Sequence, residues 1–203
     1  MGTDLVNKKK VGIYGGSFNP PHNGHLNLAV EIAEHRELDE IWFCPANINP
    51  FKADSNYTSI QHRLEMTRLA IAPFSNFKVI DIEAAREGIS YTIDTLRQLI
   101  VEFGNHIEFS LLLGDDNIFS FPSWHRAEEI VKLVPLFIGR RENGGHFPEA
   151  SPAIRDALER GITPTRVMEI TATNIRERLQ INRPCAHLIP GKVIDYINEH
   201  SLY

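Results

Sequence analysis

The sequence predicts an α/β fold, a doubly wound parallel sheet with helices on both faces. Short apolar runs of strand length alternate with longer amphipathic stretches, which is the pattern of successive βαβ units. The most continuous apolar run, residues 107–113, is typical of a central strand covered on both faces. The chain has 203 residues, 42% of them hydrophobic, enough for one well-packed domain and little more. We therefore expect a single domain over residues 1–203, with a loosely ordered start at residues 1–9 and a small C-terminal helical segment.

Composition argues against several classes of protein. The net charge of −5 leaves no broad basic surface for nucleic acid. The two cysteines, Cys44 and Cys185, suggest no disulfide framework, so a reduced cytoplasmic setting is expected. No apolar run approaches the ~20 residues needed to cross a bilayer. We expect small-molecule partners rather than nucleic acid or membrane, and the sequence leaves a homo-oligomer open.

The first half of the chain predicts three strands and two helices. A Thr-Ser-Ile-Gln run at residues 58–61 has the pattern of a capping box that opens the second helix. In order, we expect a strand at residues 11–14, a helix at 26–33, a strand at 40–45, a helix from 58–61 to 70, and a strand at 77–82.

The second half continues the alternation. After residues 90–92 a helix carries Leu96, Leu99, Ile100 and Phe103 on one face, and Gly104 is placed to end it. The elements expected after this helix are a strand at 107–113, a helix from 124 to 133, a strand at 134–138, a helix at 150–160, a strand at 167–170, and a helix from Pro190 with Val193, Ile194 and Ile197 as its packed face. We assign the C-terminal pattern, which ends in Leu202 and Tyr203, to packing.

Residues 15–25 organise the rest of the chain. They read Gly-Gly-Ser-Phe-Asn-Pro-Pro-His-Asn-Gly-His between the first strand and the first helix. Gly15 and Gly16 lack a Cβ, so the backbone can turn sharply and let a ligand come close. His22 and His25, at the helix entry, can point the same way, where the helix N-terminus adds partial positive charge. The stretch therefore predicts a polyphosphate-binding loop, although its spacings differ from a Walker A loop and from G-x-G-x-x-G. The alternative is a Pro/Asn/Gly turn with two incidental surface histidines.

This stretch resembles the HxGH nucleotidyltransferases, and its Gly-Gly-x-Phe-Asn-Pro-x-His-x-Gly-His form is similar to the nicotinate mononucleotide adenylyltransferase branch. Residues 90–96, Ser-Tyr-Thr-Ile-Asp-Thr-Leu, strongly resemble a second signature of that branch. The resemblance implies a Rossmann-like nucleotidyltransferase fold. It also implies adenylyl transfer from ATP, with Mg²⁺, to nicotinate mononucleotide in NAD biosynthesis.

Two alternatives to this activity stay open. The same chemistry can serve another phosphate acceptor, such as nicotinamide mononucleotide or phosphopantetheine. A non-catalytic nucleotide-sensing module is the other alternative, supported only by departures from the family pattern at Phe51, His125 and Ala172.

The resemblance implies a set of residues that handle ATP. Imidazole N–H groups can donate to phosphate oxygens, and we assign the two histidines to charge stabilisation because a phosphate nucleophile is already ionised. Thr173 can cap a helix, Arg176 adds a charged donor, and Asp116 can hold a ribose hydroxyl or the hydration shell of Mg²⁺. The expected catalytic residues are His22, His25 and Lys52. The expected ATP-binding residues are Gly15, Gly16, Ser17, Phe18, His22, His25, Gly114, Asp116, Thr173 and Arg176.

A second set is implied for the mononucleotide. Thr92 and neighbouring amides would bind the nicotinate carboxylate, Trp124 would stack on the pyridine ring, and Arg141 would meet the phosphate. For Trp124 a plain core position is the alternative. The full expected set is Asn47, Tyr91, Thr92, Trp124, His125 and Arg141, and no residue is expected to ligate a metal directly.

Overall fold

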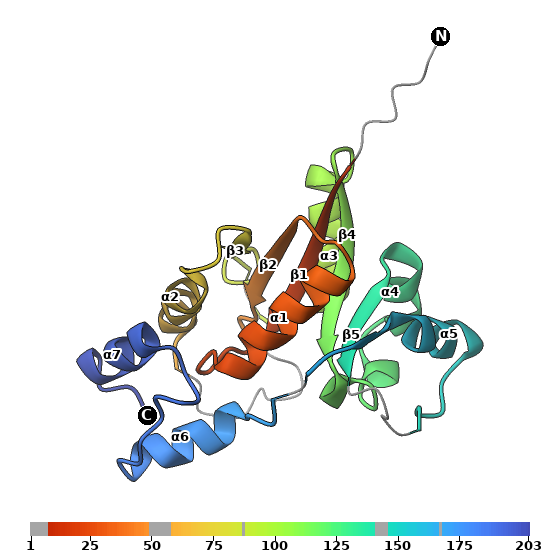
Figure 1. Ribbon diagram of the computed structural model, residues 1–203. Coiled ribbons are helices and arrows are strands. Elements are labelled where there is room, and N and C mark those ends of the chain that lie inside the picture. Colours follow the sequence, from red (N-terminus) through yellow and green to blue (C-terminus); the bar gives the residue numbers. More distant parts are fainter. Residues whose placement is uncertain (1–7, 49–57, 87, 141–145, 167) are drawn as a thin grey trace.

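A doubly wound parallel sheet forms the centre of the molecule, as predicted. The computed structural model describes residues 8–48, 58–86, 88–140, 146–166 and 168–203 (Figure 1). Within these residues six strands pair in the order β3-β2-β1-β4-β5-β6, and their pairings are parallel. The strands are β1 (Lys9–Gly16), β2 (Glu40–Pro45), β3 (Phe77–Val79), β4 (Ile107–Gly114), β5 (Leu136–Arg140) and β6 (Ile162–Pro164). The order reverses between β1 and β4, which is where ligands bind in such sheets.

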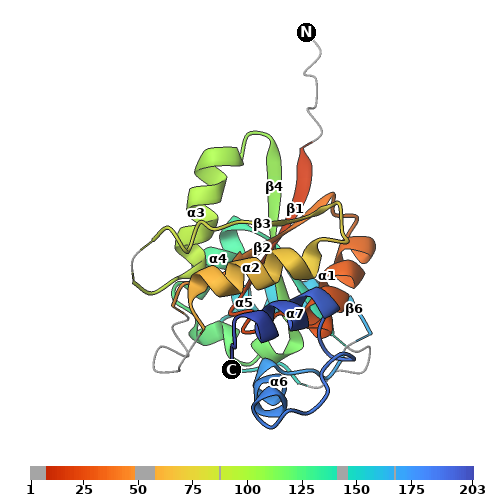
Figure 2. The same cartoon turned by 90° about the vertical axis from the view of Figure 1, so that its left-hand side faces the viewer.

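Helices cover both faces of this sheet (Figures 1 and 2). Helices α1 and α2 pack on one face, and α3, α4 and α5 pack on the other. Helices α6 and α7 lie outside this sandwich, with α7 against α2 (Figure 2). The helices are α1 (Asn23–His35), α2 (Ile60–Ile71), α3 (Thr92–Phe103), α4 (Ala127–Leu133), α5 (Pro152–Gly161), α6 (Ala172–Gln180) and α7 (Gly191–Glu199), with single 3₁₀ turns at Asp115–Asn117 and Phe121–Ser123.

Two apolar cores hold these layers together. Helix α3 shows how the pattern works, since Leu96 and Leu99 are buried against β4 and Gly104 caps the helix as predicted. Burying each leucine contributes about 1.5–3 kcal/mol. On the opposite face of the sheet, Ile32 of α1 packs with Phe43 of β2. Cys44 is a buried free thiol in the same core as α3, as expected of a small hydrophobe.

A third apolar cluster joins the C-terminal segment to the rest of the fold. Met66 of α2 packs with Ile175 of α6 and with Val193 and Ile197 of α7. Leu202 and Tyr203 pack at the edge of the same cluster. The last helix therefore uses the predicted face, and the chain after it folds back toward α2 and α6.

The predicted sixth strand at residues 167–170 is wrong. The sixth strand is β6, at Ile162–Pro164, which follows α5 directly and pairs with β5. Gly161 makes this tight turn possible, because a Cβ there would lie 2.7 Å from the carbonyl oxygen of Leu136. Residues 168–170 line a cavity instead, so this stretch forms part of a cavity wall rather than a strand.

Three smaller predictions also need correction. Ser59, not Thr58, caps α2, and its hydroxyl accepts the backbone N–H of His62 at 3.4 Å. Strand β3 ends at Val79 rather than at residue 82, and β1 takes in Lys9, the last residue of the expected loose start. Among the described residues, no helix is long and apolar enough to cross a bilayer.

Candidate active site

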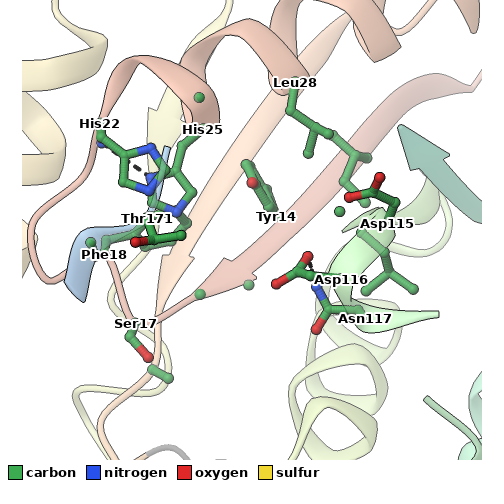
Figure 3. A pocket seen from close by; sticks show the side chains of 18 of the residues that line it. Tyr14, Ser17, Phe18, His22, His25, Leu28, Asp115, Asp116, Asn117 and Thr171 are labelled. Atoms are coloured by element: carbon green, nitrogen blue, oxygen red, sulfur yellow. Dashed lines mark hydrogen bonds between the residues drawn. The ribbon is translucent and has the colours of Figure 1, made fainter. Parts of the chain in front are cut away.

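A cavity of about 1220 Å³ lies at the carboxyl ends of β1 and β4. Because these strands are neighbours, the loop after β1 and the Gly114 turn after β4 meet at one edge of the sheet. Figure 3 shows the two histidines on one side of the cavity and Asp115, Asp116 and Asn117 on the other. The predicted motif and the predicted strand-end turn therefore face one space.

The two motif histidines form a stacked pair at the start of α1. His22 is the N-cap and His25 is the third helical residue, and their ring centroids lie 3.5 Å apart with planes at 23°. The backbone N–H of His22 donates to Nδ1 of His25 at 3.1 Å. An Nδ1 that accepts this bond leaves the ring proton of neutral His25 on Nε2. The pair points the same way, as predicted, and His25 keeps an N–H donor.

Aromatic rings fix the orientation of His25. The Phe18 ring packs edge-on against the His25 ring with centroids 5.0 Å apart, and the Tyr14 ring packs in the same way with centroids 6.1 Å apart. Phe18 is only 1% exposed and has φ of 45°, a left-handed conformation that is strained for this residue. Gly16 leaves room for it, since a Cβ there would lie 2.9 Å from the Phe18 ring. Phe18 therefore acts chiefly as a support for the imidazole.

Burial keeps His22 neutral. Its side chain is 6% exposed, and desolvation lowers its pKa to about 4. Its Nδ1 is buried and has no hydrogen-bond partner. Gly24 lies against this ring, because a Cβ there would be 3.1 Å from Nδ1 of His22. The glycine of the His-x-Gly-His motif thus makes room for the first histidine.

The turn after β4 presents a carboxylate to the same cavity. Nδ2 of Asn117 donates to Oδ1 of Asp116 at 2.9 Å, which orients the carboxylate. A Cβ on Gly114 would lie 2.5 Å from that oxygen, so a larger residue here would displace the Asp116 carboxylate. Burial raises the pKa of Tyr14, and the charge of Asp116 acts in the same direction.

The N-terminus of α6 forms another wall. Thr171, not Thr173, caps this helix, because its hydroxyl accepts the backbone N–H of Asn174 at 3.2 Å. The Thr173 hydroxyl instead accepts from Nη2 of Arg176 at 3.2 Å, and Nη1 of Arg176 donates to the carbonyl of Asn19 at 2.8 Å. The predicted pair lines the cavity, while the capping role belongs to a residue two positions earlier.

Four residues predicted for the mononucleotide also line the cavity. They are Tyr91, Thr92, Trp124 and His125. Tyr91 is the N-cap of α3, and its ring lies 4.4 Å from that of His125, which gives His125 a contact that the sequence left undefined. The Trp124 ring packs on the Phe121 ring with centroids 5.2 Å apart. Trp124 also lines the cavity, so it is not a plain core residue.

Three predicted residues are not placed in the cavity. Asn47 does not line it: its side-chain amide donates to the carbonyl of Arg86 at 2.9 Å, and its backbone N–H donates to Oγ of Ser90 at 3.1 Å. Lys52 and Arg141 lie outside the described residues. The predicted ATP residues Gly15, Gly16, Ser17 and Phe18 do line the cavity.

Arg63 is a structural residue that the sequence analysis missed. It is 2% exposed, and its guanidinium donates to the carbonyls of Ser17 at 2.9 Å, Ala46 at 2.6 Å and Asn47 at 3.0 Å. It thereby joins the loop after β1 to the loop after β2. A signal was present, because Arg63 lies one turn before Met66 on the buried stripe of α2, where a charge is unexpected.

Glu83 is a second missed residue, on the wall near Tyr91. It accepts the Thr95 hydroxyl at 2.7 Å and is also hydrogen-bonded to the Ser90 side chain. Burial raises the pKa of this carboxyl, while the hydrogen bonds and the charge of Arg86 act in the opposite direction. Glu83 therefore anchors the segment that leads into α3.

The fold and the cavity define a doubly wound α/β protein with a pocket at the strand ends, and His22 and His25 line that pocket. The family model described as cytidylyltransferase-like matches residues 13–178, which contain this whole arrangement. The nicotinate-nucleotide adenylyltransferase of Bacillus subtilis is 41% identical over 196 residues, covering 96% of this chain and 98% of that protein. A probable nicotinate-nucleotide adenylyltransferase of Oceanobacillus iheyensis is 40% identical, with 96% and 97% covered. The chain belongs to the nicotinate-nucleotide adenylyltransferase family.

A solved structure has the same fold. The nicotinic acid mononucleotide adenylyltransferase of Plasmodium falciparum, complexed with NaAD, superposes with a TM-score of 0.74 at 24% identity. The match covers 96% of this chain and 97% of that one. It confirms the predicted fold class across nearly the whole length.

Proposed function

We propose that this chain transfers the adenylyl group of ATP to nicotinate mononucleotide, giving nicotinate adenine dinucleotide and pyrophosphate. The observation that carries the proposal is the stacked His22–His25 pair, which shares one cavity with the Gly114–Asp116 turn and the N-terminus of α6. Relatives at about 40% identity that bear the name of this activity support it.

The reaction needs positioning and charge neutralisation rather than a covalent intermediate. A phosphate oxygen of the mononucleotide attacks the α-phosphorus of ATP, and the bond from that phosphorus to the bridging oxygen breaks. Pyrophosphate leaves with the electron pair. The Nε2–H of His25 donates to a phosphate oxygen as charge develops on it, and neutral His22 holds the pair in its stack.

The β- and γ-phosphates of ATP are proposed to lie at the N-terminus of α6. Free backbone N–H groups there and the Arg176 guanidinium favour anions. Lys52 is proposed to reach the same phosphates. The described residues hold no cluster of three metal-ligating side chains. Mg²⁺ is proposed to arrive with the nucleotide, and its hydration shell would lie against Asp116. When bound, Mg²⁺ would neutralise phosphate charge.

The acceptor is proposed to bind at the start of α3. The N-terminus of this helix favours a carboxylate, and Thr92 is its first residue. Trp124 offers its ring to the pyridinium, and Arg141 is proposed for the mononucleotide phosphate. This arrangement favours the acid over the amide mononucleotide, because the amide carries no charge for the helix end to stabilise.

A pyrophosphate-release assay tests the proposal. The purified chain is given ATP and Mg²⁺ with nicotinate mononucleotide, nicotinamide mononucleotide or phosphopantetheine, and kcat/KM is compared. We expect release with the nicotinate compound and at least about tenfold lower kcat/KM with the amide. Tight ATP binding with no release under any acceptor would overturn the proposal and favour a nucleotide-sensing module.

A further inference from the structure

The loop that leads into the motif histidines is hydrogen-bonded to a residue at the far end of the sequence. Residues 17–22 are called the histidine loop below. The hydroxyl of Tyr203 donates to Oδ1 of Asn19 at 2.5 Å, across 184 positions of the chain. Asn19 is 2% exposed, lines the cavity and lies three residues before His22. This contact links the C-terminal segment to the site.

We propose that Tyr203 is a positioning residue for adenylyl transfer. Its hydroxyl fixes the Asn19 side chain, and this sets the position of His22 at the end of the histidine loop and of His25 in the first turn of α1. The proposal rests on the proposed function for its kinetic readout, and on the bond to Asn19 for its physical basis.

The histidine loop is held from three separate elements. Arg63 of α2 donates to the carbonyl of Ser17 at 2.9 Å, and Arg176 of α6 donates to the carbonyl of Asn19 at 2.8 Å. Both arginine bonds go to the main chain and leave the Asn19 side chain unfixed. Tyr203 supplies that third restraint.

The surroundings of Tyr203 suit a permanent donor. Burial raises the pKa of its phenol to about 12, although a hydrogen bond with the Thr58 side chain and the charges of Arg176 and Arg63 act in the opposite direction. The hydroxyl therefore keeps its proton throughout the neutral pH range. Because the phenol stays protonated, its bond to Asn19 is suited to a structural role and not to a pH-dependent switch.

Packing alone explains the ring of Tyr203 but not its hydroxyl. The ring packs at the edge of the cluster formed by α2, α6 and α7. A phenylalanine would fill that place equally well, and a buried hydroxyl is costly unless it is hydrogen-bonded. The polar atom is the part of the side chain that reaches the histidine loop.

The test compares two tyrosine-to-phenylalanine variants of the same C-terminal segment. Tyr203→Phe removes the bond to Asn19 together with the bond to the Thr58 side chain. Tyr196→Phe removes the bond from α7 to Nδ1 of His62 at 2.9 Å, which lies on the α2 side and not in the cavity. We expect kcat of Tyr203→Phe to fall about tenfold, with KM for ATP within about twofold. We expect Tyr196→Phe to keep the kcat of the unmodified protein. Melting temperatures should fall by no more than about 5 °C in either variant.

A double-mutant cycle tests the route through Asn19. If Tyr203 acts by holding that side chain, Tyr203→Phe has little further effect on kcat in an Asn19→Ala background. An equal loss in both backgrounds, or full kcat in the single Tyr203→Phe variant, would overturn the proposal.

A readout without turnover separates this proposal from the proposed function. The imidazole NMR signals of His22 and His25 should shift in Tyr203→Phe and stay in place in Tyr196→Phe. If the unmodified protein released no pyrophosphate, the proposed function would fail while this comparison still measured the loop. Unchanged histidine signals in Tyr203→Phe would overturn the positioning role.

Discussion

Nδ1 of His25 accepts the backbone N–H of His22 at 3.1 Å, and the two rings stack with centroids 3.5 Å apart. This one relationship sets the tautomer of His25 and places both rings on the same side of the α1 entry. His22 is also buried, with 6% of its surface exposed. The last property has a consequence for stability.

The unfolding free energy should depend on pH through His22. Its pKa is about 4 in the folded chain and near 6.5 when unfolded, so between these values only the unfolded chain binds the proton. Stability therefore falls as pH falls through this window, by about 2 kcal/mol between pH 7 and pH 5. Urea denaturation at both pH values measures it. His22→Gln should lose that much of the pH dependence, and identical pH dependence in the two proteins would contradict the burial argument.

Gly24→Ala should lower kcat by displacing His22. A Cβ at this position would lie 3.1–3.2 Å from the His22 ring, closer than ordinary contact, so the ring must move by a few tenths of an ångström. We expect kcat to fall about tenfold or more, because the stacked pair is disturbed.

Gly191→Ala is the matched control for that substitution. A Cβ there meets nothing within 4 Å, at the first residue of α7. Its kcat should match that of the unmodified protein, with stability unchanged or raised by up to about 1 kcal/mol. Equal kcat for both alanine variants would show that the motif glycine does not shape the histidine pair.

Arg63→Met should destabilise the fold far more than the loss of a surface arginine. It leaves the carbonyls of Ser17 and Ala46 without their donor inside the protein, at a cost of about 3 kcal/mol or more. Arg68→Met is the control on the same helix, since its pair with Glu65 at 3.4 Å is exposed and worth less than about 0.5 kcal/mol. Chemical denaturation measures the free energy of unfolding of both variants. A similar loss of stability in the two would contradict the role of Arg63 in joining the loops after β1 and β2.

The sequence predicted the parts of the structure that leave a periodic or local signal. The alternation of apolar runs predicted the positions of five of the six strands that the structure describes, and the order of elements predicted the doubly wound sheet. The motif at residues 15–25 and the turn at Gly114 were placed at strand ends, and the carboxyl ends of neighbouring parallel strands must meet.

What the sequence could not predict depends on distant partners. Residues 168–170 have the apolar character of a strand, but they line a cavity, and only the tertiary fold distinguishes the two. The choice of Thr171 over Thr173 as the N-cap depends on where α6 begins. The sequence offers a threonine at both positions and does not decide between them. The bond from Tyr203 to Asn19 joins segments with no shared local pattern, so the C-terminal residues were assigned to packing alone.

The central claim is that the His25 imidazole stabilises charge on the phosphates during adenylyl transfer. Pyrophosphate release from ATP and nicotinate mononucleotide should be measured for His25→Ala beside His35→Ala, an exposed histidine at the far end of the same helix. We predict that kcat falls about 10²–10³-fold in His25→Ala, with ATP still bound, and stays unchanged in His35→Ala. Turnover by His25→Ala within about threefold of the unmodified protein would contradict the account.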